Sequence, residues 1–207
     1  MNRFTRSAIF VLAGLASTAH AAELTTTFAS NNSQNGNMFD VVTLGNALTV
    51  TGLSLNLETG THGLEIFTRN GSWVGAAQDA SAWVLLGTGT VTSAGPGAPS
   101  FWDVADFSLN ASSITGFYIT TTTPIGDGLM KYTNGTAVGS IAAQNQDLQI
   151  LEGAGKEYPF SATFEPRIWN GTIHYEVAAV PEPSTYAMLL AGLGMTGLMV
   201  RRRKQLR

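Results

Sequence analysis

The chain has 207 residues, of which 11 are basic and 14 are acidic, and it contains no cysteine. The missing cysteines exclude disulfide bonds, cysteine nucleophiles, cysteine-ligated zinc and iron–sulfur clusters. Residues 22–180 hold only four of the basic residues but 13 of the acidic ones, a net charge of about −9. A body this acidic repels a phosphate backbone, so we expect no nucleic acid partner.

The N-terminal end has the three parts of a secretory signal peptide. Arg3 and Arg6 form a basic region, and residues 8–16 form an apolar region too short to cross a bilayer. Ala19 and Ala21 then frame an A-x-A cleavage site. We expect residues 1–21 to be removed on export, which leaves residues 22–180 as one folded domain with a full core.

The body shows a strand pattern, because apolar and polar residues alternate and no stretch has a helical apolar period. Leu53, Leu55 and Leu57 are expected to face the core, as is Phe117, while Tyr118 is expected to face water. Strands are expected near residues 24–29, 38–44, 47–57, 63–69, 83–92, 101–109, 114–122, 129–133, 138–143, 147–151, 158–164 and 167–177. The pattern predicts an all-β fold, an antiparallel two-layer β-sandwich of jelly-roll type.

Asn-Gly pairs mark expected turns, since both residues tolerate the positive φ of a type I′ hairpin. Asn70-Gly71 is expected to join the strand at 64–69 to a strand near Trp73. Asn134-Gly135 is expected to join 129–133 to 138–142. Asn170-Gly171 is either a hairpin turn or a bulge inside one strand.

The C-terminal end combines an apolar stretch with a basic run. Residues 185–200 carry no charge, and as a helix they would be about 24 Å long, a little short of the ~30 Å hydrocarbon core. Arg201, Arg202, Arg203 and Lys204 follow at once, and such a run stays on the cytoplasmic side. We therefore expect a single transmembrane helix over 185–200; a buried core helix is the alternative.

Pro181-Glu182-Pro183, the apolar stretch and the basic run together resemble the PEP-CTERM sorting signal of Gram-negative bacteria. The resemblance covers about residues 180–207 and implies that the tripeptide is recognised by exosortase, a membrane-embedded cysteine transpeptidase-like enzyme. It implies removal of the tail and delivery of the body to the cell surface or the exopolysaccharide matrix. Two prolines are expected to keep Glu182 in an extended segment beside the membrane.

The sequence shows no recognisable set of catalytic residues. There is no Gly-x-Ser-x-Gly elbow, and both His62, in an expected turn, and His174, on a strand, are expected at the surface. Asp103 and Asp106 are three residues apart, which places them on opposite faces of a strand. We expect a non-catalytic protein. The alternative, a polysaccharide-acting hydrolase, needs two carboxylates or a Ser–His pair that converge in a cleft.

Three residues are candidates for binding a ligand, and they support a second hypothesis, a carbohydrate-binding module. Trp73 follows a turn, and Trp102 is out of phase with Phe101 and is expected to face solvent. Arg167 could clamp a uronic acid, although a structural ion pair with Glu165 or Asp147 is the favoured interpretation.

Calcium is the metal that best suits an exported β-sandwich without cysteine. Asp127, in Gly126-Asp127-Gly128, is the weak candidate ligand, and the chain has no Asp-x-Asp-x-Asp-Gly loop.

Overall fold

The computed structural model describes residues 20–122, 128–177 and 183–205. Its contacts divide the chain into a body, His20–Ala178, and a second unit made of Met1–Ala19 and Ala179–Arg207. Within the described part of that second unit lies one helix, α1 (Pro183–Gln205). Each unit is described by itself below.

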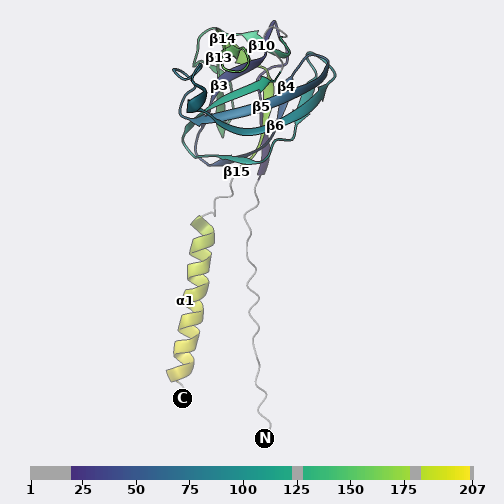
Figure 1. The fold of residues 1–207 in the computed structure, drawn as a ribbon. Coiled ribbons are helices and arrows are strands. Elements are labelled where there is room, and N and C mark those ends of the chain that lie inside the picture. Colours follow the sequence, from purple (N-terminus) through teal and green to yellow (C-terminus); the bar gives the residue numbers. More distant parts are fainter. Residues whose placement is uncertain (1–19, 123–127, 178–182, 206–207) are drawn as a thin grey trace. The chain divides into compact units, whose positions relative to one another are not determined.

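The described residues of the body form strands and one 3-10 turn, η1 (Ala80–Ala82) (Figure 1). The strands are β1 (His20–Thr25), β2 (Asn32–Gln34), β3 (Gly36–Thr43), β4 (Leu48–Asn56), β5 (Gly60–Asn70), β6 (Val84–Ser93), β7 (Pro99–Trp102), β8 (Phe107–Leu109), β9 (Ile114–Thr121), β10 (Met130–Asn134), β11 (Ile141–Gln144), β12 (Leu148–Leu151), β13 (Gly153–Lys156), β14 (Thr163–Trp169) and β15 (Gly171–Val177).

These strands form two antiparallel sheets. The five-stranded sheet has the order β1-β15-β4-β7, and β8 also pairs with β4. The ten-stranded sheet has the order β2-β10-β14-β13-β3-β9-β5-β6, with β12 beside β3 and β11 beside β12. The predicted all-β, antiparallel, two-sheet body is confirmed. The number of described strands exceeds the eight strands of a jelly roll, so the predicted jelly-roll topology is not confirmed.

One hydrophobic core lies between the sheets. Leu53 and Leu55 on β4 meet Phe39 on β3 and Phe117 on β9, and all four are fully buried. The predicted inward face of β4 is therefore confirmed. The register of β4 against β15 shifts between His174 and Tyr175, and such a bulge lets the inward face continue at other positions of β4.

A second cluster covers the outer face of the ten-stranded sheet. It contains Met38, Trp73, Trp83, Tyr118 and Ala154, all of them buried. Trp73 and Trp83 come from the long connection between β5 and β6, which supplies apolar cover on the side of the sheet away from the main core. The expectation that Tyr118 faces water is wrong, because β9 is buried on both faces.

The Asn-Gly pairs do not act as predicted. Gly71 is followed by a loop in which Trp73 lies, and the partners of β5 are β6 and β9. After Asn134, β10 pairs with β2 and β14 while β11 pairs with β12, so no hairpin forms there. Asn170 separates β14, in the ten-stranded sheet, from β15, in the five-stranded sheet. It marks a change of sheet, neither a hairpin nor a bulge within one strand.

Two strands were missed and several expected strands were wrong in extent, among them 24–29, which the structure places at His20–Thr25. β2 and the glycine-rich β13 carry little apolar alternation, and the predicted strand 101–109 is split into β7 and β8. Only the last residues of the predicted strand 158–164 are extended, since β14 begins at Thr163. In β13, a Cβ added to Gly153 would lie 1.9 Å from the carbonyl oxygen of Met38. The strand therefore depends on glycine for its closeness to β3.

Helix α1 includes more than the predicted apolar stretch, because it begins at Pro183 and continues through the basic run to Gln205. Among the described residues, no helix has both the length and the apolar character needed to cross a membrane. The transmembrane helix predicted over 185–200 is thus not supported.

The predicted signal peptide lies almost entirely outside the described residues, and the structure gives it no support. Ala19 is not described. Ala21 lies in β1, where it pairs with Glu176 of β15. Cleavage after Ala21 stays a prediction, and it would leave Ala22 as the first paired residue of β1.

Candidate functional site

The C-terminal candidate begins at the start of α1. Pro181 and Glu182 lie outside the described residues, whereas Pro183 is the first residue of the helix. Proline is well suited to this position because its φ is already helical and the first helical N–H needs no partner. The expectation that Pro183 belongs to an extended segment is therefore wrong.

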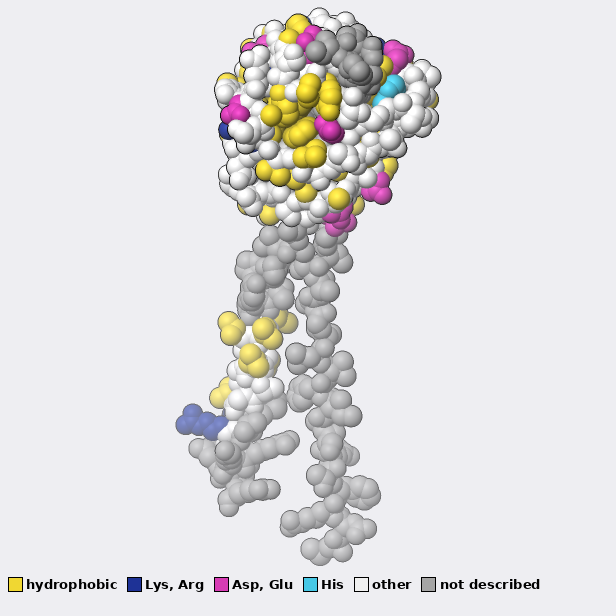
Figure 2. Space-filling view, in the orientation of Figure 1, with side chains coloured by type: hydrophobic (Ala, Val, Ile, Leu, Met, Phe, Trp, Pro, Cys, Tyr) yellow, Lys and Arg dark blue, Asp and Glu magenta, His cyan; other side chains and the backbone are white. Residues whose placement is uncertain are grey.

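The described side chains of α1 are mostly exposed, including large apolar ones such as Leu190 and Leu193. Arg201 and Arg202 are exposed near the end of the helix, so the predicted basic stop continues the helix and does not follow it. Space-filling Figure 2 shows acidic side chains spread over the visible face of the body, with few basic ones.

Trp102 faces the core and Phe101 faces solvent, the reverse of the predicted arrangement. Trp102 is only 5% exposed, and its indole points into the core near Gly89. Phe101 is 57% exposed on the outer face of β7. The prediction that Trp102 faces solvent is wrong because β7 ends at Trp102 and its inward phase is set by pairing with Leu53 of β4.

Trp73 is buried as well, with 2% of its surface exposed. Trp73 lines an open pocket of about 550 Å³ together with Val74, Asp79 and Glu165. A sugar ring needs an exposed aromatic face for stacking, which neither Trp73 nor Trp102 offers. The observation on which the carbohydrate-binding hypothesis depended is therefore not found.

Arg167 forms neither of the ion pairs expected for it. Its Nη1 donates to the carbonyl oxygen of Pro166 at 2.7 Å, and its guanidinium lies 5.8 Å from the centre of the Tyr132 ring. The Asp147 carboxylate instead accepts from the Tyr175 hydroxyl at 3.0 Å. Arg167 thus packs on the body, which leaves no support for a uronate clamp.

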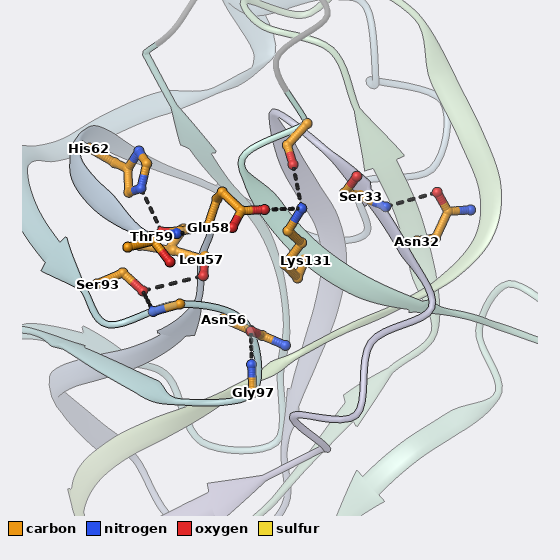
Figure 3. A network of polar contacts seen from close by, with 12 residues as sticks. Asn32, Ser33, Asn56, Leu57, Glu58, Thr59, His62, Ser93, Gly97 and Lys131 are labelled. Atoms are coloured by element: carbon orange, nitrogen blue, oxygen red, sulfur yellow. Dashed lines mark hydrogen bonds and ion pairs between the residues drawn. The ribbon is translucent and has the colours of Figure 1, made fainter.

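His62 is not a surface turn residue but a buried residue of β5. Figure 3 shows it within a polar network, where its Nε2 lies 2.7 Å from the carbonyl oxygen of Glu58. Glu58 in turn forms an ion pair with Lys131 at 2.8 Å, and Lys131 donates to the carbonyl oxygen of Gly128 at 3.2 Å (Figure 3). His62 therefore stabilises the segment that follows β4, through its contact with the backbone of Glu58.

The calcium candidate, Asp127, lies outside the described residues, and calcium binding stays a prediction. Within the ranges that the structure describes, no three His, Asp or Glu side chains converge in a way that could hold a metal ion. Asp103 and Asp106 lie in the exposed connection between β7 and β8, not on one strand.

His174 lies on the outer face of β15, where its ring contacts two polar side chains. Its Nε2 is 2.9 Å from the Ser54 hydroxyl oxygen on β4, and its Nδ1 is 3.2 Å from Oε2 of Glu23 on β1. Sequence alternation already placed Ser54 and His174 on outward faces. It could not reveal that β1, β15 and β4 are neighbours, which is what brings the three side chains together.

Lys156 is a buried cation that sequence analysis did not single out. Its side chain is fully buried at the end of β13, where Nζ donates to the carbonyl oxygen of Ser161 and, at 2.9 Å, to the Thr163 hydroxyl. Burial disfavours the charged form and lowers the pKa of Lys156 from 10.5 to about 8.

The pKa of Lys156 predicts an unusual pH dependence of stability. Between pH 8 and 10 the unfolded chain binds more protons than the folded one, so the free energy of unfolding should rise by up to about 1.4 kcal/mol per pH unit. Above pH 10 the free energy of unfolding should fall again. Burial raises the pKa of Tyr175 to about 12, so the unfolded chain loses the tyrosine proton at a lower pH than the folded one. Urea unfolding at pH 7.5 and 9.5 measures this rise in stability. If the Lys156→Met variant showed a rise of equal size, titration of Lys156 would not be its cause.

Comparisons with known proteins concern mainly the C-terminal end. Residues 179–204 match the PEP-CTERM protein-sorting motif. No curated protein matches the chain. Among solved structures, the crystal structure of the infectious bursal disease virus VP2 subviral particle is similar at 14% sequence identity and a TM-score of 0.25. That alignment covers 97% of this chain and 55% of the viral one, and a match at this TM-score says nothing about fold.

The motif starts two residues after Val177, the last residue of β15, and ends at Lys204, the last residue of the basic run. The chain thus carries the PEP-CTERM protein-sorting motif of exported, exosortase-processed proteins, joined to a β-sheet body of unassigned family.

Proposed function

We propose that the β-sheet body is exported and then presented at the cell surface or in the extracellular polysaccharide by exosortase-type processing of its C-terminal motif. The match to the sorting motif over residues 179–204 carries this proposal. The position of the motif supports it, since the motif follows β15 directly and processing there would leave every strand of the body intact.

The short apolar stretch of α1 suits a temporary anchor. Arginine side chains can extend their charged ends to the bilayer surface, and a bilayer thins around a short apolar stretch at modest cost. In the proposed pathway the C-terminal segment holds the protein at the inner membrane until the tail is removed. Sorting of this kind requires no activity of the body itself.

Replacing Glu182 tests the proposal. In an exosortase-containing bacterium, the Glu182→Ala chain should stay in the membrane fraction at a mass that includes the basic tail, because the recognition tripeptide is lost. The wild-type chain should be recovered from the matrix without that tail. Fractionation and intact-mass measurement distinguish the two forms.

Glu176→Ala is the matched control, since Glu176 is an exposed acidic residue of β15 just before the motif. It should be processed like the wild type. Recovery of Glu182→Ala from the matrix with its tail removed would overturn the proposed sorting route.

A further inference from the structure

The outer face of the five-stranded sheet carries a serine, a histidine and a carboxylate in hydrogen-bonded sequence. The Ser54 hydroxyl oxygen is 2.9 Å from His174 Nε2, and His174 Nδ1 is 3.2 Å from Glu23 Oε2. A nucleophilic hydroxyl, a base and a group that orients the base are connected through these same atoms in serine hydrolases. Such sites are recognised by geometry and not by chain order.

The strand register holds the three side chains in place. Glu23 lies directly opposite His174, and His174 lies opposite Gly52, two residues along β4 from Ser54, the partner of Thr172. Because Gly52 has no side chain, the Phe101 ring lies over it, and a Cβ there would be 2.7 Å from that ring. The Phe101 ring also meets the His174 ring edge-on, with centroids 5.3 Å apart. The imidazole is thus fixed by Glu23 on one side and by Phe101 on the other.

A hydrogen-bond donor is available beside the hydroxyl. Thr172 is the direct cross-strand partner of Ser54, and directly opposed side chains on one face lie about 5 Å apart at Cβ. The Thr172 hydroxyl pairs with that of Thr25 at 2.8 Å, an arrangement in which either oxygen can donate. A side-chain hydroxyl can serve as the donor to a developing oxyanion.

We propose that Ser54 is a nucleophile towards short-chain acyl esters, with His174 as its base and Glu23 as a positioning residue. The Ser54 oxygen bonds to the ester carbonyl carbon while its proton moves to His174 Nε2. The carbonyl oxygen takes up the negative charge beside Thr172. The carbon–oxygen bond to the alcohol then breaks, and the alcohol leaves with the proton from His174. Water releases the acid from Ser54 by the same steps.

The surroundings of Ser54 restrict the acyl group but not the alcohol. Ser54 is only 6% exposed, and the Phe101 ring lies against the ring of His174, so only a small planar acyl group fits. Phe101, beside His174, is 57% exposed, so the alcohol part of the ester would extend past it over the outer face of the sheet. Such a path admits an ester carried on a polymer, and the acidic body favours neutral substrates over anionic ones.

Covalent labelling of the full chain with a fluorophosphonate tests the proposal. The wild type should gain one adduct, which peptide mapping places on Ser54. Ser54→Ala should gain none there, and His174→Ala should label at least about 100-fold more slowly, the usual contribution of a general base. Glu23→Gln should shift the pH dependence of labelling, an effect that loss of a merely structural contact would not produce. Ser108→Ala, at an exposed serine of β8, is the control and should label like the wild type.

Circular dichroism of each variant separates a lost reaction from a lost fold. The wild type should also hydrolyse p-nitrophenyl acetate faster than Ser54→Ala does. A folded wild type that forms no Ser54 adduct, or labelling that is unchanged in folded His174→Ala, would overturn the proposal. Neither result bears on sorting, because labelling does not involve residues 179–204.

Discussion

Gly153→Ala should destabilise the body by about 3 kcal/mol or more, at the upper end of overpacking effects. A Cβ at this position would lie 1.9 Å from the Met38 carbonyl oxygen and 2.8 Å from Cα of Phe39. These are backbone atoms of β3, a strand that pairs on both sides, so they cannot move aside as a flexible side chain would. Urea unfolding of the full chain measures the loss of stability.

Gly45→Ala provides the matched control. Gly45 is exposed, and a Cβ there would meet no atom within 4 Å. This substitution should leave the free energy of unfolding within about 0.5 kcal/mol of the wild type. If Gly153→Ala were as stable as Gly45→Ala, the close approach of β13 to β3 would be incorrect.

Asp40→Ala should lower stability by about 2–3 kcal/mol, because it removes a charged acceptor from a buried site. The carboxylate accepts from the Ser72 hydroxyl at 2.5 Å and from the Trp73 backbone N–H at 2.9 Å. Burial raises the pKa of Asp40, and the hydrogen bond from Ser72 opposes that rise. Without the carboxylate, the connection after β5 should detach and expose Trp73, which a red shift of tryptophan emission reports.

Asp106→Ala is the control for this substitution, since Asp106 is exposed in the connection after β7. Its stability and emission should match those of the wild type. An Asp40→Ala chain with unchanged emission and stability would show that the aromatic cover of the ten-stranded sheet does not depend on this anchor.

The alternation of side chains predicted most strands because burial of one face imposes a period of two. It predicted β4 well, where leucines at every second position face a single core. It failed at β9, because Tyr118 is covered by a loop from elsewhere in the chain. A period of two cannot distinguish a strand covered on one face from one covered on both. The glycine-rich β13 shows no alternation at all, since Gly153 is required by contact with the backbone of Met38 and Gly155 by contact with the Tyr132 ring.

Of the two functional candidates, the C-terminal motif could be recognised from the sequence and the Ser54–His174–Glu23 contacts could not. The C-terminal motif is local in sequence, and it was therefore recognised from residues 181–204 alone. The Ser54, His174 and Glu23 contacts depend on strand order, which is set by pairings over more than a hundred residues. Asn170 shows the difficulty most clearly, because nothing in an Asn-Gly pair distinguishes a hairpin from a passage between sheets. Trp73 and Trp102 were misjudged for the same reason, since their cover comes from distant strands.

The position of β15 has a consequence for how the protein is made. The last strand of the body lies between β1 and β4, at the centre of the five-stranded sheet. Among the described strands β1 pairs with β15 alone, so this pairing must wait until β15 has been synthesised. Pairings this distant in the chain form slowly. The sorting motif begins two residues after β15. Synthesis of the strand that completes the five-stranded sheet is therefore followed directly by synthesis of the processing signal.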